Sequence, residues 1–262
     1  MTDPLAPTPG ARNNSASLRR ALGILLSLAD DRAQRGYTLG ELAEHVSLSK
    51  PTVLRLLQPL VDAHFVQLLP TGTYRLGWRN AQLGQAYLAG TDPHRDMRDV
   101  LERLSARTSE TVHLVKADFP RVVYIDKVDS PLPVRMASRI GSTQPAYCTS
   151  VGKAMLAHAD EDVVDSVIAA GMPARTANTI TSGDALRSEL AASRARGWAV
   201  DDIENEVGVR CVAAPIFDPE GTATSAISVS APEERMPPSE VERVAPLVRA
   251  AAQEISLRWG TR

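Results

Sequence analysis

The stretch 38-TLGELAEHVSLSKPTVLRLLQPLVDAHFVQLLPTGTYRLG-77 begins with two helical patterns and ends with a hairpin pattern. Thr38 and Glu41 have the spacing of a capping box, which predicts that a helix begins directly after Thr38. Proline is tolerated best in the first turn of a helix, so Pro51 predicts a second helix from about Lys50 to about residue 63. Helix, turn and helix in this order are typical of a DNA-binding module.

Two strand patterns, at residues 65–69 and 73–76, follow this helix pair and are separated by Pro70-Thr71-Gly72. Proline and glycine between two such runs predict a β-hairpin. Apolar residues at helical spacing predict a further helix upstream, at residues 17–29. Three helices and a hairpin are the order of a winged helix-turn-helix, which we expect for residues 17–77. Pro59 predicts a local bend in the third helix, or a slightly early end.

The side chains that contact DNA are expected at the start of the third helix, on the hairpin and on the first helix. A helix in the major groove reads bases with the residues of its first turns, whereas basic residues elsewhere bind phosphates. The expected contacts are Arg19, Ser49, Lys50, Thr52, Val53, Arg55, Gln58 and Arg75. The alternative is that Lys50 and Arg55 only form the solvated face of a surface helix.

Charge is divided unevenly along the 262 residues. Residues 1–80 carry nine Lys or Arg and six Asp or Glu, whereas the rest of the chain carries 20 Lys or Arg and 25 Asp or Glu. A basic N-terminal part followed by an acidic remainder is compatible with phosphate contact by the first part alone.

The two cysteines, Cys148 and Cys211, exclude a disulfide framework and fit a reducing compartment. No window of the sequence has the length and apolar character of a membrane span, and residues 1–16 lack the apolar core of a secretory signal. We therefore expect a cytoplasmic protein with a disordered N-terminal arm at residues 1–16.

A helix at about residues 78–89 leads to a Gly/Pro break at 90–93, the expected domain boundary. Strand and helix patterns then alternate. The expected strands are 111–117, 121–128, 133–138, 210–217 and 223–230, and the expected helices lie around 97–104 and at 149–159, 161–170, 182–196 and 238–259. Because hairpins join most of the strands, we expect an α+β domain around an antiparallel sheet.

The stretch 38–77 resembles the DNA-binding domain of the IclR family, named for the isocitrate lyase regulator. Two further blocks, 133-PVRMASRIGSTQPAYCTSVGKAMLA-157 and 197-GWAVDDIENEVGVRCVAAPIFDPEGTATSAISVS-230, resemble that family's effector-binding domain. The resemblance extends from about Ser17 to Trp259. Pro51 departs from the family pattern, where a small polar residue is expected, and its presence removes a possible hydroxyl contact with DNA.

The resemblance implies a transcription regulator with a winged helix-turn-helix at 17–77, a linker helix at 78–92 and a GAF/PAS-like α+β effector-binding domain at 93–262. It implies a small organic acid, carboxylate or aromatic, as effector, a palindromic double-stranded operator, and a dimer or a dimer of dimers. Repression and activation both remain open. Carried over residue by residue, the family's pocket implicates Met136, Gln144, Ser150, Val151, Asp201, Val209, Cys211, Ser228 and Ser230.

The residues themselves are compatible with such a pocket. Ser228 and Ser230 alternate along a strand, so both hydroxyls point to one face. The residues after Thr149 are expected to begin a helix whose free N–H groups suit a carboxylate. Gln144 stands where a family member with a known pocket has an apolar residue, which indicates a more polar or differently shaped ligand. The alternatives are that the two serines face solvent and that Cys211 is a small buried hydrophobic residue.

Two other function classes remain open. A GAF-like redox enzyme would use Cys148 and Cys211, although no His–Asp arrangement that activates a thiol is evident. A metal-sensing regulator would use these cysteines with His113, Asp201 and Asp202, but their spacing matches no zinc signature, and His113 is interpreted as a packed histidine. We therefore expect no catalytic residue, no metal, no cofactor and no membrane partner.

Overall fold

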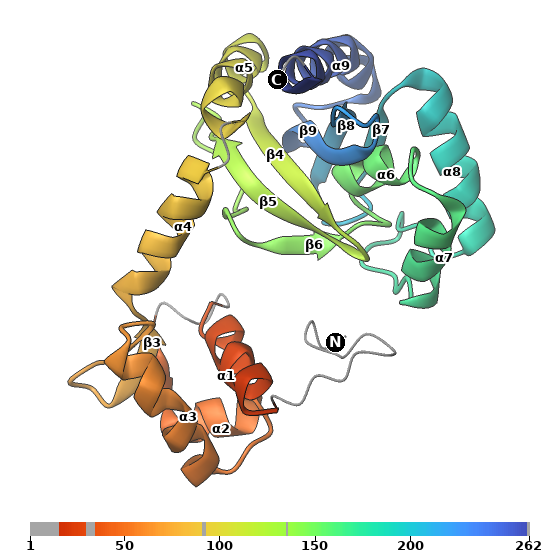
Figure 1. Cartoon of the computed structure of the whole chain (residues 1–262). Helices are drawn as coiled ribbons and strands as arrows, with labels where there is room; N and C mark the ends of the chain where they lie inside the picture. Colours follow the sequence, from red (N-terminus) through yellow and green to blue (C-terminus); the bar gives the residue numbers. More distant parts are fainter. Residues whose placement is uncertain (1–15, 30–34, 91–92, 135, 261–262) are drawn as a thin grey trace. The chain divides into compact units, whose positions relative to one another are not determined.

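A computed structural model describes residues 16–29, 35–90, 93–134 and 136–260 (Figure 1). The chain divides into two compact units, Met1–Thr91 and Asp92–Arg262, called here the N-terminal and C-terminal units. Apart from Ala16, the expected disordered arm lies outside the described residues. In the described part of the chain, no helix is both long and apolar enough to cross a membrane.

The N-terminal unit consists of helices and a small three-stranded sheet. Its elements are α1 (Ala16–Ser27), β1 (Tyr37–Thr38), α2 (Leu39–His45), α3 (Lys50–Asp62), β2 (Val66–Leu68), β3 (Thr73–Leu76) and α4 (Trp78–Gly90). The strands are antiparallel in the order β1-β3-β2. The fold is the predicted winged helix-turn-helix. Strand β1 is additional: two residues are too few to show an alternating pattern in sequence.

Local interactions determine where these helices begin. The Glu41 N–H donates to Thr38 Oγ1 over 3.3 Å and the Thr38 N–H donates to Glu41 Oε2 over 2.8 Å, so the capping box is confirmed. Ser47 has a φ of 52°, a left-handed conformation within the turn between α2 and α3. Helix α3 begins at Lys50 as predicted and continues through Pro59 to Asp62, so it does not end early.

The C-terminal unit is built around an antiparallel sheet with the strand order β6-β5-β4-β9-β8-β7. Its strands are β4 (Thr111–Asp118), β5 (Arg121–Val128), β6 (Thr143–Pro145), β7 (Ala199–Asp202), β8 (Val209–Phe217) and β9 (Ala223–Pro232). Its helices are α5 (Pro93–Thr108), α6 (Ser150–Leu156), α7 (Glu161–Ala169), α8 (Gly183–Arg196) and α9 (Pro238–Gly260). The predicted α+β class with an antiparallel sheet is confirmed.

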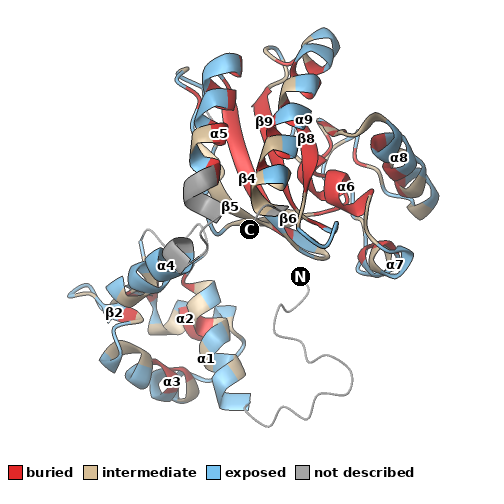
Figure 2. Ribbon diagram, turned by 45° about the horizontal axis from the view of Figure 1, so that its top comes forward, coloured by how far each residue is buried: buried red, intermediate tan, exposed pale blue. Residues whose placement is uncertain are grey.

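Alternate residues of the central strands face two separate cores. On one face, residues such as Leu114, Val212 and Ile227 pack against α5 and α9. On the other face, residues such as Ala213 and Ala226 pack against α6, α7 and α8. Figure 2 shows β4, β8, β9 and α6 almost entirely buried between these layers. Side chains on the α6 face therefore lie in the interior even where they are polar.

The prediction of a strand at 133–138 is wrong, because the described residues of this segment form no strand. The proline at 133 lacks the N–H that a ladder needs. The carbonyl oxygens of Met136 and Ser138 instead accept hydrogen bonds from Lys127 Nζ, over 2.7 and 2.9 Å. The edge strand is β6, which pairs Gln144 with Val122 of β5. Strand β7, which has four residues, is likewise additional to the prediction.

Candidate nucleic-acid interface and effector site

Helix α3 has one face in the core of the N-terminal unit and one face in solvent. Val53, Leu56 and Leu57 are buried against α1, α2 and the sheet. Of the other residues expected to contact DNA, Ser49, Lys50, Arg55, Gln58 and Arg75 are exposed, whereas Arg19 and Thr52 are half-buried. A helix with this division offers only its outer face to a groove of DNA.

Val53 is fully buried in the core of the N-terminal unit. The expectation that Val53 contacts DNA is therefore wrong. At helical periodicity it lies on the same side as Leu56 and Leu57, away from Thr52 and Arg55. Its contribution is to pack α3 against the rest of the unit.

The outer face of α3 contains both constrained and free polar groups. The hydroxyls of Ser49 and Thr52 lie 2.9 Å apart, and Gln58 Nε2 donates to Asp62 Oδ1 over 3.0 Å. Arg55 makes no hydrogen bond or ion pair with any residue that the structure describes. Its guanidinium donors are available to a base edge or a phosphate.

The β2–β3 hairpin, which is the wing of this fold, holds its arginine by a hydrogen bond, unlike Arg55 of α3. Gln67 of β2 is paired with Arg75 of β3, and Gln67 Oε1 accepts from Arg75 Nε and Nη2 over 3.4 and 3.3 Å. This cross-strand contact holds the exposed guanidinium close to the hairpin. A held cation of this kind suits a phosphate contact, which positions a protein on DNA without reading the sequence.

Four of the expected effector residues lie together on the α6 face of the large sheet. Cys211 of β8 is paired with Ser230 of β9 on one side and with Asp201 of β7 on the other. Ser228 lies two residues before Ser230 and is therefore on the same face. Ser228, Ser230 and Asp201 are buried and Cys211 is half-buried, which excludes the interpretation that the serines face solvent. We call these four residues the polar sheet cluster.

The remaining expected residues are placed around this cluster by other elements. Ser150 and Val151 begin α6 and are buried. The Gly152 N–H is already bonded to the Thr149 side chain over 3.2 Å, so it is not free for a carboxylate. Val209 begins β8 and is half-buried.

Met136 lies in the irregular segment after β5. Gln144 lies on the edge strand β6, and β5 and β4 stand between β6 and the serines of β9. In strand order, Gln144 is the expected residue most remote from the polar sheet cluster.

His113 of β4 joins this cluster, although the sequence predicted a packed histidine there and not an effector residue. It is paired with Ser228, its Nδ1 lies 3.3 Å from Ser230 Oγ and its Nε2 lies 2.6 Å from Ser138 Oγ. Burial, and secondarily the charge of Lys127, lowers the pKa of His113 to about 3. The imidazole is thus neutral at neutral pH. In the sequence, the position of this histidine within the apolar run of β4 already indicates that its ring is buried.

Burial also shifts the acidic groups of the cluster. The pKa of Asp201 is raised to about 7 by burial, against the effect of hydrogen bonds from the backbone N–H groups of Glu204 (2.7 Å) and Asn205 (3.2 Å). Burial raises the pKa of the Cys148 thiol to about 12 and also raises that of Cys211. Neither thiol is ionised at neutral pH.

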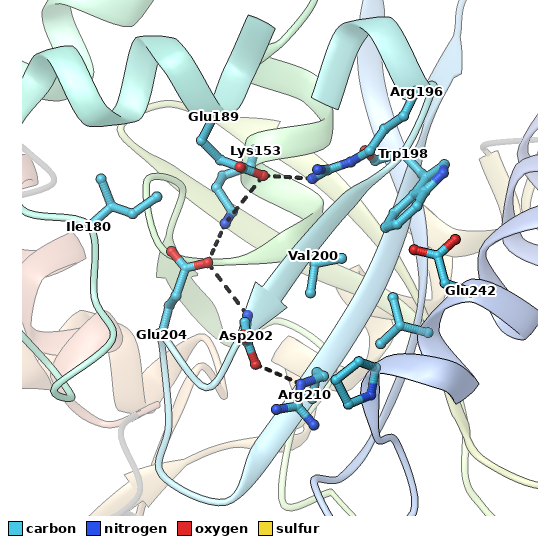
Figure 3. Close-up of a pocket in the computed structure, with 12 residues that line it drawn as sticks. Lys153, Ile180, Glu189, Arg196, Trp198, Val200, Asp202, Glu204, Arg210 and Glu242 are labelled. Atoms are coloured by element: carbon cyan, nitrogen blue, oxygen red, sulfur yellow. Dashed lines mark hydrogen bonds and ion pairs between the residues drawn. The ribbon is translucent and has the colours of Figure 1, made fainter. Parts of the chain in front are cut away.

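A separate cavity of about 270 Å³ lies in the same unit, between α6, α8, β7, β8 and the start of α9 (Figure 3). Lys153, Glu189, Asp202 and Glu204 are among its lining residues. None of the expected effector residues lines it.

The comparisons with known proteins agree over nearly the whole chain. The model of the IclR helix-turn-helix domain matches residues 17–70, and the model described as bacterial transcriptional regulator IclR C-terminal matches residues 85–257. The chain is 36% identical over 247 residues to the HTH-type transcriptional regulator KdgR of Escherichia coli K12, covering 94% of this chain and 93% of that protein.

Solved structures agree as well. An IclR transcriptional regulator from Alicyclobacillus acidocaldarius has a TM-score of 0.84 at 30% identity, over 93% of this chain and 98% of its own. An IclR homologue from Microbacterium hydrocarbonoxydans, crystallised with 4-hydroxybenzoate, shares the fold with a TM-score of 0.79 at 24% identity, over 94% of this chain and 100% of its own.

Proposed function

This chain belongs to the IclR family of bacterial transcriptional regulators, and from that membership we propose that it binds a palindromic operator under the control of a small organic acid. The observation that carries the proposal is the family match to both units, at residues 17–70 and 85–257. The structure supports the DNA-binding part through the exposed outer face of α3. In this role Arg55 and Lys50 contact bases, and Arg75 and Arg19 contact phosphates.

The polar sheet cluster is the proposed effector site. Serine hydroxyls can donate hydrogen bonds to a carboxylate, and Ser228 and Ser230 provide them on one buried face. His113 contacts Ser230 and Ser138 through its two ring nitrogens and so helps to orient the Ser230 hydroxyl. Met136, Ser150, Val151 and Val209 are proposed to complete the walls, with Gln144 at the periphery. The 4-hydroxybenzoate held by the Microbacterium protein supports an aromatic acid as the first class of effector to test.

Self-association is proposed through the N-terminal unit. Leu18, Leu22 and Leu26 recur every four residues on α1 and are 57%, 40% and 51% exposed. Isolated exposed leucines are ordinary, but a continuous stripe of them is typical of an interface. A dimer with paired α3 helices would match a palindromic operator. A dimer of dimers would need a second contact to join two such pairs.

The state of the two cysteines favours a regulatory role over a redox enzyme. The nucleophile in such chemistry is the thiolate, and burial keeps both Cys148 and Cys211 protonated. A metal-sensing role has no support either, since no three His, Cys, Asp or Glu side chains within the described ranges are grouped so as to hold a metal ion. We therefore propose a regulatory role and assign no catalytic residue.

Selection from random duplex DNA with the full-length protein tests the operator proposal. We expect enrichment of an inverted repeat whose half-sites are about one helical turn apart, or a multiple of it. Failure to enrich any sequence would contradict it. A thermal-shift screen of carboxylates and aromatic acids then tests the effector class, because a ligand that binds only the folded state raises the melting temperature. Neutral alcohols and amides of the same carbon skeletons are the controls.

A further inference from the structure

Two side chains on the α6 face of the large sheet are partly accessible although both lie on inner strands. Cys211 is on β8, between β7 and β9, and Tyr124 is on β5, between β6 and β4. Both are half-buried. In a layered domain the inner strands are normally covered by the helices that pack on the sheet. The layer of α6, α7 and α8 therefore does not cover the sheet completely beside the polar sheet cluster.

Tyr124 extends from β5 toward this cluster. It is paired with Val115 of β4 and packs against the core on the α6 face. Its ring lies edge-on against the imidazole of His113, with 4.9 Å between the ring centroids. His113 in turn contacts the Ser230 hydroxyl. The phenol ring is thus placed beside the serines that are proposed to bind the effector.

The hydroxyl of Tyr124 makes no hydrogen bond with any residue that the structure describes. The nearby Tyr147 differs, because its hydroxyl donates to the carbonyl oxygen of Pro173 over 2.5 Å. The Tyr124 oxygen is also not sealed off from solvent: the fully enclosed unpaired side-chain atoms of the described residues belong to Tyr37 and Glu204. Tyrosine hydroxyls in such surroundings usually have a partner. This one is available to a molecule from outside the chain.

Acidic groups lie near this hydroxyl. Burial, followed by the charges of these groups, raises the pKa of Tyr124, and the groups are Cys211, Asp201, Glu206 and Cys148. Burial raises the pKa of Asp201 to about 7, so its carboxyl is largely protonated below that pH, whereas Glu206 adds an exposed carboxylate. A ligand carboxylate would be repelled on this side of the cluster. A neutral hydroxyl, however, can donate to an acidic oxygen and accept from the phenol.

We propose that Tyr124 determines the specificity of the effector site by forming a hydrogen bond with an uncharged hydroxyl that the effector carries in addition to its carboxylate. This inference rests on the proposed effector site, in which Ser228 and Ser230 of β9 bind the carboxylate. The hydroxyl then lies toward β8 and β7. Adjacent strands are about 4.8 Å apart, so β9 and β7 are separated by roughly 10 Å. A hydroxylated aromatic acid, with a rigid ring between its two polar groups, suits this arrangement.

Calorimetric titration of the full-length protein tests the role of Tyr124. The probes are benzoate, 3-hydroxybenzoate, 4-hydroxybenzoate and 4-methylbenzoate, whose methyl group has nearly the size of a hydroxyl. We expect one hydroxybenzoate to bind about fivefold more tightly than benzoate and 4-methylbenzoate. Tyr124→Phe should remove this preference and change benzoate affinity by less than about twofold. If Tyr124→Phe weakens all four acids equally, or leaves the preference intact, the proposal is overturned.

Tyr37→Phe is the matched control, because it removes a hydroxyl that also lacks a partner but lies in the core of the N-terminal unit. It should change none of the four affinities.

Ser230→Ala separates the failure of this inference from the failure of the proposed effector site, since it should weaken all four acids. If Ser230→Ala weakens them and Tyr124→Phe keeps the hydroxyl preference, only the role of Tyr124 is wrong. If neither variant changes any affinity, the effector site itself is wrong. If no probe binds the parent protein, the ligand class and this inference both fail, whereas the operator proposal is tested with DNA alone and stands apart.

Discussion

The Ser230 hydroxyl of β9 lies 3.3 Å from Nδ1 of His113 on the neighbouring strand β4. The other ring nitrogen of His113 lies 2.6 Å from the Ser138 hydroxyl. A neutral imidazole has one donor and one acceptor nitrogen, so the two serines have opposite hydrogen-bonding roles toward the ring. The orientation of the Ser230 hydroxyl is therefore coupled to the segment that contains Ser138 and Met136.

Removing either serine of β9 should impair the effector response without affecting DNA binding. Ser228→Ala and Ser230→Ala each delete one buried hydroxyl, and a hydrogen bond of this kind contributes about 1 kcal/mol, or about fivefold in effector affinity. Operator affinity is measured by fluorescence anisotropy with and without the effector. A normal response from both variants would show that the polar sheet cluster is not the effector site.

Arg55→Ala should weaken operator binding by about 1–3 kcal/mol and relax the preference at one base pair. The reason is that Arg55 is exposed on α3 and has no partner in the described part of the chain. Anisotropy titrations with the operator and with a scrambled duplex measure the effect, and Arg107→Ala in the C-terminal unit is the control. An equal loss on both duplexes would assign Arg55 to phosphate contact.

Gly77→Ala should disrupt the N-terminal unit, whereas Gly84→Ala should not. A Cβ at Gly77 would lie 2.1 Å from the carbonyl oxygen of His64, so the backbone between the wing and α4 must shift. We expect a loss of about 3 kcal/mol in unfolding free energy. Gly84 is exposed in α4 with no atom within 4 Å of the added Cβ, and alanine there should stabilise by up to about 1 kcal/mol. Urea unfolding of both variants measures these changes.

His113 and Asp201 should make opposite contributions to the pH dependence of the unfolding free energy. The pKa of His113 falls from 6.5 to about 3 on folding, so between these values only the unfolded state binds its proton and stability rises with pH. The pKa of Asp201 rises from 3.8 to about 7, so its carboxyl is protonated only in the folded state over that range and stability falls with rising pH. Between pH 3.8 and 6.5 the two slopes oppose each other.

In each single variant, the unfolding free energy should therefore change with pH, because only one of the two opposing contributions is left. Relative to the parent, His113→Gln should make stability fall by up to about 1.4 kcal/mol for each unit of rising pH, and Asp201→Asn should make it rise by a similar amount. Urea denaturation at several pH values between 4 and 6.5 provides the measurement. Parallel curves for all three proteins would mean that neither group is buried in its neutral form.

The features that the sequence alone determines are those with local causes. The capping box of Thr38 and Glu41 involves residues three apart, and the proline at 51 marks the start of α3 through its own missing N–H. The Asp218 to Gly221 turn of the β8–β9 hairpin is equally local, with a 3.0 Å hydrogen bond between the two residues. Such interactions depend only on residues a few positions apart, so the helices, the hairpins and the α+β class can be predicted from the pattern.

Only the tertiary structure decides which side of an element is buried and which distant groups meet. Val53 belongs to the core rather than to the DNA-binding face because α1 and α2 pack on that side of α3. Lys153 and Glu204 are 51 residues apart in the chain and meet because α6 packs beside the end of β7. Contacts of this kind depend on strand order and layer packing, which no local pattern encodes. The place of His113 beside Ser228 and Ser230, and the cavity at β7, therefore became visible only in the folded chain.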